Sequence, residues 1–204
     1  MPARNIEKEY VSESYYHIYN RGVEKRKIFL DDKDYVVFLG LLKRYLSKEN
    51  GKDQYGRDGV TFYKEVELLV FCLMPNHFHL LIYIDSDARK MTELMRRVCT
   101  SYTMYFNKRY KRVGHLFQGR FKASRIITDS YLTHISRYIH LNPKDYLDWP
   151  YSSLPYYTKG WDAEWIMPEK ITSLYEPGTY GKFLADYEDY KSMLDEIKYE
   201  LADK

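Results

Sequence analysis

Two histidines, His77 and His79, stand two residues apart in the stretch Met-Pro-Asn-His-Phe-His-Leu-Leu that begins at Met74. The residues after them are apolar and β-branched or aromatic, which predicts a strand with Pro75 just ahead of it. Because side chains alternate along a strand, both imidazoles would project from one face. Two neutral imidazoles on a rigid strand can bind a divalent metal and leave positions open for phosphate oxygens. The same spacing is also found on the solvent-facing side of a half-buried strand, so spacing alone does not decide between a metal site and an ordinary strand face.

A second group of residues with chemical potential lies on a predicted helix over residues 131–142. Leu132, Ile135 and Ile139 form its apolar stripe, and Tyr131, Tyr138 and Asn142 lie along the flank of that stripe. Tyr138 and Asn142 are four residues apart and therefore neighbours. The phenol could act as a nucleophile if a cation or base helped it to ionise, and Asn142 could offer a carbonyl oxygen to the same metal. The chain has 23 tyrosines, most of which must serve packing.

The elements that must position these residues follow from periodicity. We expect strands over residues 13–21, 62–73, 77–84 and 124–128, with the second and third joined across Met74–Asn76 as a tight antiparallel pair. Helices are expected over residues 34–46, beginning near Asp31 or Asp32, over 88–107, and over 131–142 with Asp129 or Ser130 as its cap. This order predicts an α+β fold, a ferredoxin-like antiparallel sheet with helices packed on it.

The chain after residue 155 is expected to be an extension of that domain. We assign residues 1–155 to one domain, and residues 156–204 to a linker and a C-terminal amphipathic helix. The linker contains Trp161 and Trp165. The helix would begin near Gly181 and carry an apolar stripe made of Phe183, Leu184, Tyr187, Met193, Leu194, Ile197 and Leu201. Docking on its own domain is the simplest role for this helix, and binding of a partner is the alternative.

Charge is distributed unevenly along the chain. Residues 144–204 hold seven Lys or Arg and thirteen Asp or Glu, and the rest of the chain holds 25 basic and 16 acidic residues. No acidic residue occurs between Glu93 and Asp129. A basic tract of this kind attracts a polyanion, because neutralising phosphates releases counterions. The candidate DNA contacts are Arg21, Arg97, Lys108, Arg109, Lys111, Arg112, Arg120, Lys122 and Arg125. Phe117 and Phe121 could stack on unpaired bases, or anchor their loop to the core.

Composition narrows the class of protein. The 204 residues are 45% hydrophobic and 30% charged, which is typical of one well-buried domain and not of a disordered chain. No run of 18 apolar residues and no signal peptide is visible, so we expect a cytoplasmic protein. Cys72 and Cys99 form no Cys-x-x-Cys pair and are expected to be reduced, packed thiols.

Four blocks of the sequence, in order, resemble the signature segments of the single-tyrosine HUH transposases, and most closely those of the repeat-associated tyrosine transposases. The blocks are Tyr16–Gly22, Met74–Leu81, Gly114–Lys122 and Arg137–Pro143. The resemblance implies that His77 and His79 hold a divalent metal, Mg²⁺ or Mn²⁺, and that Asn142 is the third ligand, where relatives often carry glutamine. It implies that Tyr138 attacks a phosphodiester in single-stranded DNA and leaves a 5′-phosphotyrosine link and a free 3′-hydroxyl. Tyr102, Tyr105 and Tyr131 are the alternatives for the nucleophile.

The function expected from this resemblance is a metal-dependent endonuclease and strand transferase, a transposase that acts at sites near DNA hairpins. A non-catalytic protein that binds hairpin or single-stranded DNA on the same scaffold is the main alternative. A hydrolase that uses activated water is a third. A DNA partner, no membrane, and a monomer or homodimer are expected.

Overall fold

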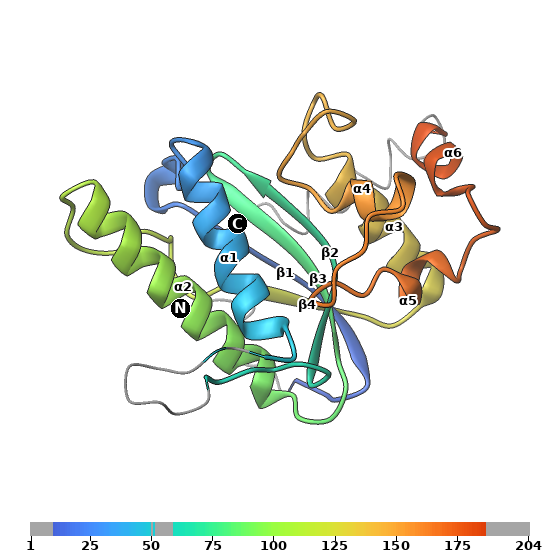
Figure 1. Cartoon of the computed structure of the whole chain (residues 1–204), viewed down its shortest axis with the longest axis horizontal. Coiled ribbons are helices and arrows are strands. Elements are labelled where there is room, and N and C mark those ends of the chain that lie inside the picture. Colours follow the sequence, from blue (N-terminus) through green and yellow to red (C-terminus); the bar gives the residue numbers. More distant parts are fainter. Residues whose placement is uncertain (1–9, 50, 52–58, 187–204) are drawn as a thin grey trace, which may run out of the picture.

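The computed structural model describes residues 10–49, 51 and 59–186, and its centre is a four-stranded antiparallel sheet (Figure 1). The spatial order of the strands is β2-β3-β1-β4. Their bounds are β1 Ser14–Arg21, β2 Val66–Met74, β3 His77–Ile84 and β4 Lys122–Ile126. Helices α1 (Asp32–Leu46) and α2 (Arg89–Arg109) cover one face, and α3 (Asp129–His140) lies across the other. The predicted α+β, ferredoxin-like fold is confirmed.

Short elements complete the chain. A single 3-10 turn, η1 (Val23–Lys25), follows β1. Beyond α3 the helices in the described residues are short, namely α4 (Leu154–Thr158), α5 (Glu169–Thr172) and α6 (Tyr180–Ala185), and they lie on the α3 side of the sheet (Figure 1). No helix in the described part of the chain has the length and apolar character needed to cross a membrane.

Most predicted element bounds lie within a few residues of those observed. Strand β3 matches, and α1 begins where expected because the Asp31 side chain accepts a hydrogen bond from the Asp34 N–H. The expectation that Asp129 or Ser130 caps α3 is wrong. Thr128 is the cap, with extended backbone and a side chain that accepts from the Tyr131 N–H. Threonine is common both in strands and at helix N-caps, and for this reason the sequence pattern assigned Thr128 to the end of the predicted strand over residues 124–128.

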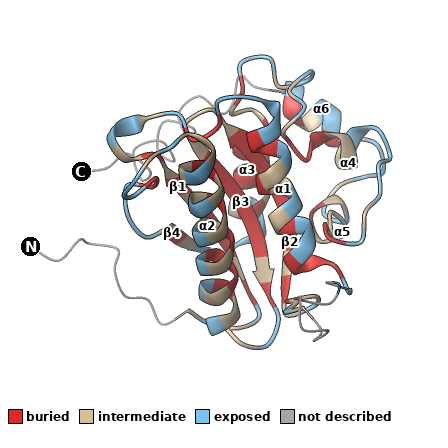
Figure 2. Ribbon diagram, turned by 60° about the vertical axis from the view of Figure 1, so that its left-hand side comes forward, coloured by how far each residue is buried: buried red, intermediate tan, exposed pale blue. Residues whose placement is uncertain are grey.

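The sheet separates two hydrophobic cores. The core beneath α1 and α2 includes Ile18, Phe78 and Leu80, and the core beneath α3 includes Leu81 and Ile139. Figure 2 shows that the strands between these layers are almost entirely buried. Because β3 is covered on both faces, most of its residues are apolar, and only His77 and Tyr83, near its two ends, are less than fully buried.

A buried carboxylate joins α1 to α2. Asp34 is 0% exposed and accepts hydrogen bonds from the Leu30 N–H, from the phenols of Tyr105 and Tyr110, and from Arg109. The lengths of these four bonds are between 2.8 and 3.0 Å. Asp34 therefore holds together the two helices that support one face of the sheet.

Replacing Asp34 with asparagine is expected to lower the free energy of unfolding by about 2 to 3 kcal/mol, because charge-assisted hydrogen bonds in a buried site are lost. Urea denaturation followed by circular dichroism measures this change. The exposed Asp145 is the control, and Asp145→Asn should change the free energy by less than about 0.5 kcal/mol. Equal stability of the two variants would contradict the structural role of Asp34.

The segment after α3 covers the outer edge of β2. The Leu73 N–H donates to Tyr151 O, the Ser153 N–H to Phe71 O, and the Met167 N–H to Leu68 O. Trp165 and Ile166 are buried in the core beneath α1 and α2. Tyr180 and Leu184 of α6 are buried in the core beneath α3, so the described part of the expected C-terminal helix docks on its own chain. The rest of that helix lies outside the described residues, and the division at residue 155 stays a prediction.

Candidate metal and tyrosine site

His77 and His79 lie on the face of β3 that α3 crosses, beside the tight turn from β2. Their ring centroids are 5.0 Å apart with an interplanar angle of 84°. His79 pairs with Tyr19 and His77 with Arg21 across the β1–β3 ladder. His79 is 4% exposed, while His77 is only partly buried. The pair is therefore held on a largely buried strand of the sheet, with His77 nearer to solvent.

Backbone hydrogen bonds fix the turn that precedes His77. The N–H groups of Ile28 and Phe29 both donate to Pro75 O, and the Gly22 N–H donates to Asn76 O at 2.8 Å. A Cβ atom on Gly22 would lie 2.2 Å from Arg26 O, so only glycine allows this close approach. The position of the histidine pair thus depends on the loop that follows β1.

Tyr138 reaches the histidine pair from α3. Its ring centroid is 5.4 Å from that of His79 and 6.1 Å from that of His17, in edge-to-face geometry, and the residue is 8% exposed. Leu132, Ile135 and Ile139 are all buried, as the predicted stripe requires, and they seat α3 on the sheet. A phenol, two imidazoles and the flank of one helix therefore meet at one place.

Asn142 connects the tyrosine to the histidines. Its Oδ1 lies 3.2 Å from Nε2 of His77, and its side chain interacts with the Tyr138 phenol in a way that lowers the pKa of that group. Helix α3 ends at His140, two residues earlier than predicted, but the Asn142 N–H still contacts Ile139 O. The structure thus brings together the four side chains named from the sequence as nucleophile and metal ligands.

The hydrogen bonds around His77 leave two lone pairs facing each other, an arrangement that suits a bound cation. Nδ1 of His77 lies 2.7 Å from Oδ1 of Asn76, and an amide oxygen only accepts, so Nδ1 carries the proton of the neutral ring. Nε2 then holds a lone pair, and it faces Oδ1 of Asn142, which also offers only lone pairs. A cation bound by both atoms would satisfy this arrangement. Among the described residues no three His, Cys or acidic side chains gather as a metal site, so water or phosphate oxygens would complete the coordination.

Burial sets the protonation states of these groups. Burial lowers the pKa of His77, and it lowers the pKa of His79 well below the usual value, with the neighbouring imidazoles adding to the effect. Both rings are therefore neutral near pH 7, which is the form that binds metals. Burial raises the pKa of Tyr138 to about 12, although the hydrogen bond from Asn142 opposes this shift. The phenol needs a nearby positive charge to ionise.

A buried polar network docks α3 against β2 and α6. His140 Nδ1 lies 2.7 Å from the Tyr180 hydroxyl, and its Nε2 lies 2.8 Å from the Ser153 hydroxyl. Ser153 also binds both backbone groups of Phe71 on β2, and Tyr180 donates to Ser136. The sequence did not suggest this network, because its members come from four separate segments of the chain.

His140 is expected to make the protein sensitive to acid. Burial lowers its pKa to about 3, so the folded state keeps the ring neutral while the unfolded chain binds a proton below about pH 6.5. Its stabilising contribution is therefore complete above that pH and is lost as the pH falls towards 3. Between pH 6 and 4, His140→Gln should reduce the slope of unfolding free energy against pH by about 1.4 kcal/mol per unit.

Urea denaturation at a series of pH values measures this slope. Ser136→Ala removes another member of the same network that does not titrate, so it should lower stability and keep the slope. If both variants kept the wild-type slope, His140 would not be the acid-sensitive group.

The candidate DNA-contacting residues fall into different environments. Arg97 is paired with Glu93 and Arg109 with Asp31 and Asp34, so both also stabilise the helix layer. Arg112 donates to Asn107 and to the backbone oxygen of His115. The remaining candidates at the end of α2, on the following loop and on β4 are exposed, and they are Lys108, Lys111, Arg120 and Arg125.

Two of the cations lie beside the histidine pair. Arg21 is the cross-strand partner of His77, and it hydrogen-bonds Gln118. Lys122 pairs with Tyr19, and its Nζ lies 5.9 Å from the centroid of that ring. Burial and the charge of Arg21 lower the pKa of Lys122. The basic loop is attached here too, because the Gln118 N–H donates to Arg21 O. Positive charge therefore borders the histidine site.

The other aromatic candidates, for base stacking and for the nucleophile, lie away from the histidine pair or pack in the core. Phe117 is 7% exposed and packs edge-to-face on Phe78, so it anchors its loop to the core. Phe121 is partly buried against the same core. Tyr102 donates to Ile28 O and Tyr105 to Asp34, both on the opposite side of the sheet from the histidine pair. Tyr131 lies about two helical turns before Tyr138, near the start of α3.

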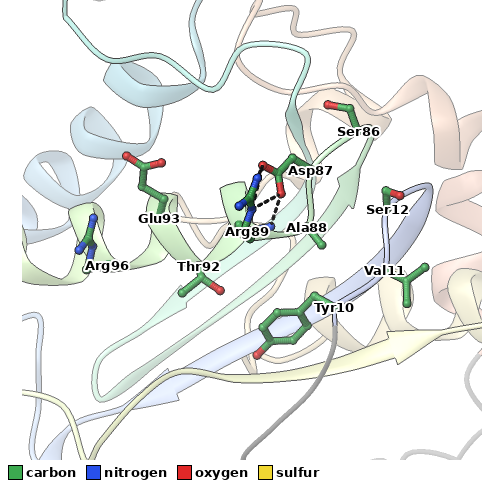
Figure 3. A pocket seen from close by; sticks show the side chains of 10 residues that line it. All are labelled: Tyr10, Val11, Ser12, Ser86, Asp87, Ala88, Arg89, Thr92, Glu93 and Arg96. Atoms are coloured by element: carbon green, nitrogen blue, oxygen red, sulfur yellow. Dashed lines mark hydrogen bonds and ion pairs between the residues drawn. The ribbon is translucent and has the colours of Figure 1, made fainter.

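A separate pocket lies at the far end of the sheet (Figure 3). It has a volume of about 840 Å³ and lies between residues 10–12 and the start of α2. Ser14 at that end of β1 pairs with Ile84, whereas Arg21 at the other end pairs with His77, so about 23 Å of strand separates the pocket from His77. Its Asp87 is paired with Arg89. This pocket is not part of the histidine site.

Comparisons with known proteins agree with the resemblance found in the sequence. Residues 58–142 match the family described as "Transposase IS200 like", and this span contains all four site residues. The structure of a REP-associated tyrosine transposase bound to a REP hairpin is 16% identical and has a TM-score of 0.57. That match covers 74% of this chain and 82% of the other. A protein from Deinococcus radiodurans assigned as a transposase is 14% identical, with a TM-score of 0.40, over 65% of this chain and 93% of the other. No curated protein matches significantly.

Proposed function

We propose that this chain, which matches the IS200-like transposase family over residues 58–142, cuts and rejoins single-stranded DNA through a 5′-phosphotyrosine intermediate. One observation carries the proposal: Tyr138, Asn142, His77 and His79 converge on one face of the sheet. The reaction would be metal-dependent, and the target sites would lie near DNA hairpins.

Tyr138 is the nucleophile in this proposal. Its Oη forms a bond to the phosphorus, and the bond from phosphorus to the 3′-oxygen breaks. The phenol gives up its proton to solvent and the leaving 3′-oxygen takes one up, so the step balances. Because one phosphodiester replaces another, the 3′-hydroxyl of a second strand can later reverse the reaction without a nucleotide cofactor. Asn142, whose side chain interacts with the phenol, would orient it.

His77 and His79 would hold the divalent metal, Mg²⁺ or Mn²⁺, with Asn142 Oδ1 close enough to contribute. When bound, such a cation supplies charge that polarises the phosphate and stabilises the departing oxygen. Arg21 and Lys122 would contact phosphates next to the scissile bond, and the exposed lysines and arginines of the basic loop would contact the backbone farther away.

A hairpin in the target is proposed because the REP-associated transposase that shares this fold is bound to one. The basic loop between α2 and β4 lies beside Arg21, so a folded strand bound there would present its flank to the histidine site. One chain supplies all four side chains of the site, which supports activity as a monomer, with a homodimer as the other arrangement.

The test incubates the full chain and Mn²⁺ with labelled single strands that carry hairpins taken from inverted repeats beside its gene. A covalent adduct that survives a denaturing gel is expected, with a free 3′-hydroxyl on the other product. Tight binding without an adduct would favour a non-catalytic DNA-binding protein. Cleavage without an adduct would favour a hydrolase that uses activated water.

A further inference from the structure

A hydrogen bond joins two buried imidazoles next to the proposed metal site. Nε2 of His17 lies 2.9 Å from Nδ1 of His79, and the rings stack with centroids 5.1 Å apart and an interplanar angle of 24°. His17 is 1% exposed and His79 is 4% exposed, so water cannot replace the bond. The sheet register creates the contact, because His79 pairs with Tyr19 and His17 occupies the diagonal position on the same face.

The proton in this bond decides which nitrogen of His79 is free. A neutral imidazole has one N–H and one lone pair, so a single proton between the rings sets the tautomer of both. If His17 donated from Nε2, His79 would carry its own proton on Nε2 and could not bind a metal there. If His79 donates from Nδ1, its Nε2 keeps the lone pair.

We propose that His17 is a positioning residue, which accepts the hydrogen bond from Nδ1–H of His79 and so keeps Nε2 of His79 ready to bind a metal. The inference rests on the proposed metal site. Its support is the matching arrangement at His77, whose Nδ1 donates to Oδ1 of Asn76 at 2.7 Å. In both His77 and His79 a neighbouring side chain hydrogen-bonds Nδ1, so Nε2 is the nitrogen that would bind the metal.

This role separates His17 from an ordinary core residue. Partners that hold the second nitrogen of a metal-binding imidazole typically change metal affinity by about 10- to 100-fold when removed. A residue that only filled space at position 17 could be replaced by a ring of similar size without loss of affinity. His17→Phe keeps an aromatic ring and removes the acceptor, whereas His17→Gln restores an acceptor oxygen.

The first measurement is made on the wild-type protein without metal. Long-range ¹⁵N–¹H correlation spectra at pH 7.5 distinguish the two tautomers of each histidine. The expected result is a protonated Nδ1 and an unprotonated Nε2 at His79. The opposite pattern would overturn the proposal, and this measurement does not depend on any variant folding.

The second measurement is Mn²⁺ affinity by calorimetry, with thermal unfolding recorded separately. His17→Phe is expected to raise the Kd about 10- to 100-fold and His17→Gln to return it to within about threefold of wild type. A folded His17→Phe with wild-type affinity, or a His17→Gln variant as weak as His17→Phe, would overturn the role of His17 alone. If the wild-type protein bound no Mn²⁺, both the metal site and this inference would fall.

Discussion

Replacing Tyr138 with phenylalanine is expected to reduce covalent adduct formation by roughly 10⁴-fold or more, which is the scale seen when an enzyme loses its nucleophile. The change removes one oxygen from a ring that is already packed edge-to-face on His79, so the fold should remain. DNA binding should stay within a few-fold of wild type, because Tyr138 is 8% exposed and offers little surface to a ligand. Single-turnover assays with labelled hairpin substrates measure the rate.

Tyr131→Phe is the matched control, since it removes the same atom from the same helix. Tyr131 lies seven residues before Tyr138, at the N-terminal end of α3, and its variant should form the adduct at the wild-type rate. Adduct formed by Tyr138→Phe and lost in Tyr131→Phe would transfer the nucleophile to Tyr131. Adduct formed by both would exclude both residues.

Loss of the imidazoles has the second largest expected effect. His77→Ala and His79→Gln should each weaken Mn²⁺ binding by more than about 100-fold and slow adduct formation by roughly 10³-fold, because each removes one of only two nitrogen ligands. Chelation of the metal from the wild-type protein should have the same effect on the rate. Calorimetry measures the first quantity and the single-turnover assay the second.

His115 provides the control for this prediction. It is exposed on the basic loop, so His115→Ala should leave Mn²⁺ affinity unchanged. If His77→Ala bound Mn²⁺ as tightly as His115→Ala does, the cation would have to bind elsewhere. Wild-type cleavage that persisted in excess chelator would argue against metal dependence altogether.

Periodicity was sufficient to predict the sheet and the faces of its elements. The strand that carries His77 and His79 was predicted with its observed bounds, because an apolar run after Pro75 leaves few alternatives. Helix ends were less certain. Thr128 suits both a strand and a cap, and only the observed backbone at that residue decides between them.

Contacts between distant segments could not be predicted in the same way. The bond between His17 and His79 depends on the register of β1 against β3, and a shift of one residue would turn His17 into the opposite core. The basic tract was correctly recognised as a charge pattern. Its composition did not reveal that Arg109 is paired with carboxylates, since Asp31 and Asp34 lie 78 and 75 residues away in the sequence.

The residues of the site lie on two separate parts of the fold, the sheet and α3, and the two products of cleavage would be held by different parts. The histidine pair belongs to the sheet, whereas Tyr138 belongs to α3, which packs on the sheet through a buried interface that includes His140. After cleavage, the 5′ end of the DNA would be covalently attached to Tyr138 on α3, and the 3′ end would stay near the strands of the sheet. The stability of the interface between α3 and the sheet would then govern how far the two ends of the cut DNA strand can separate before they are rejoined.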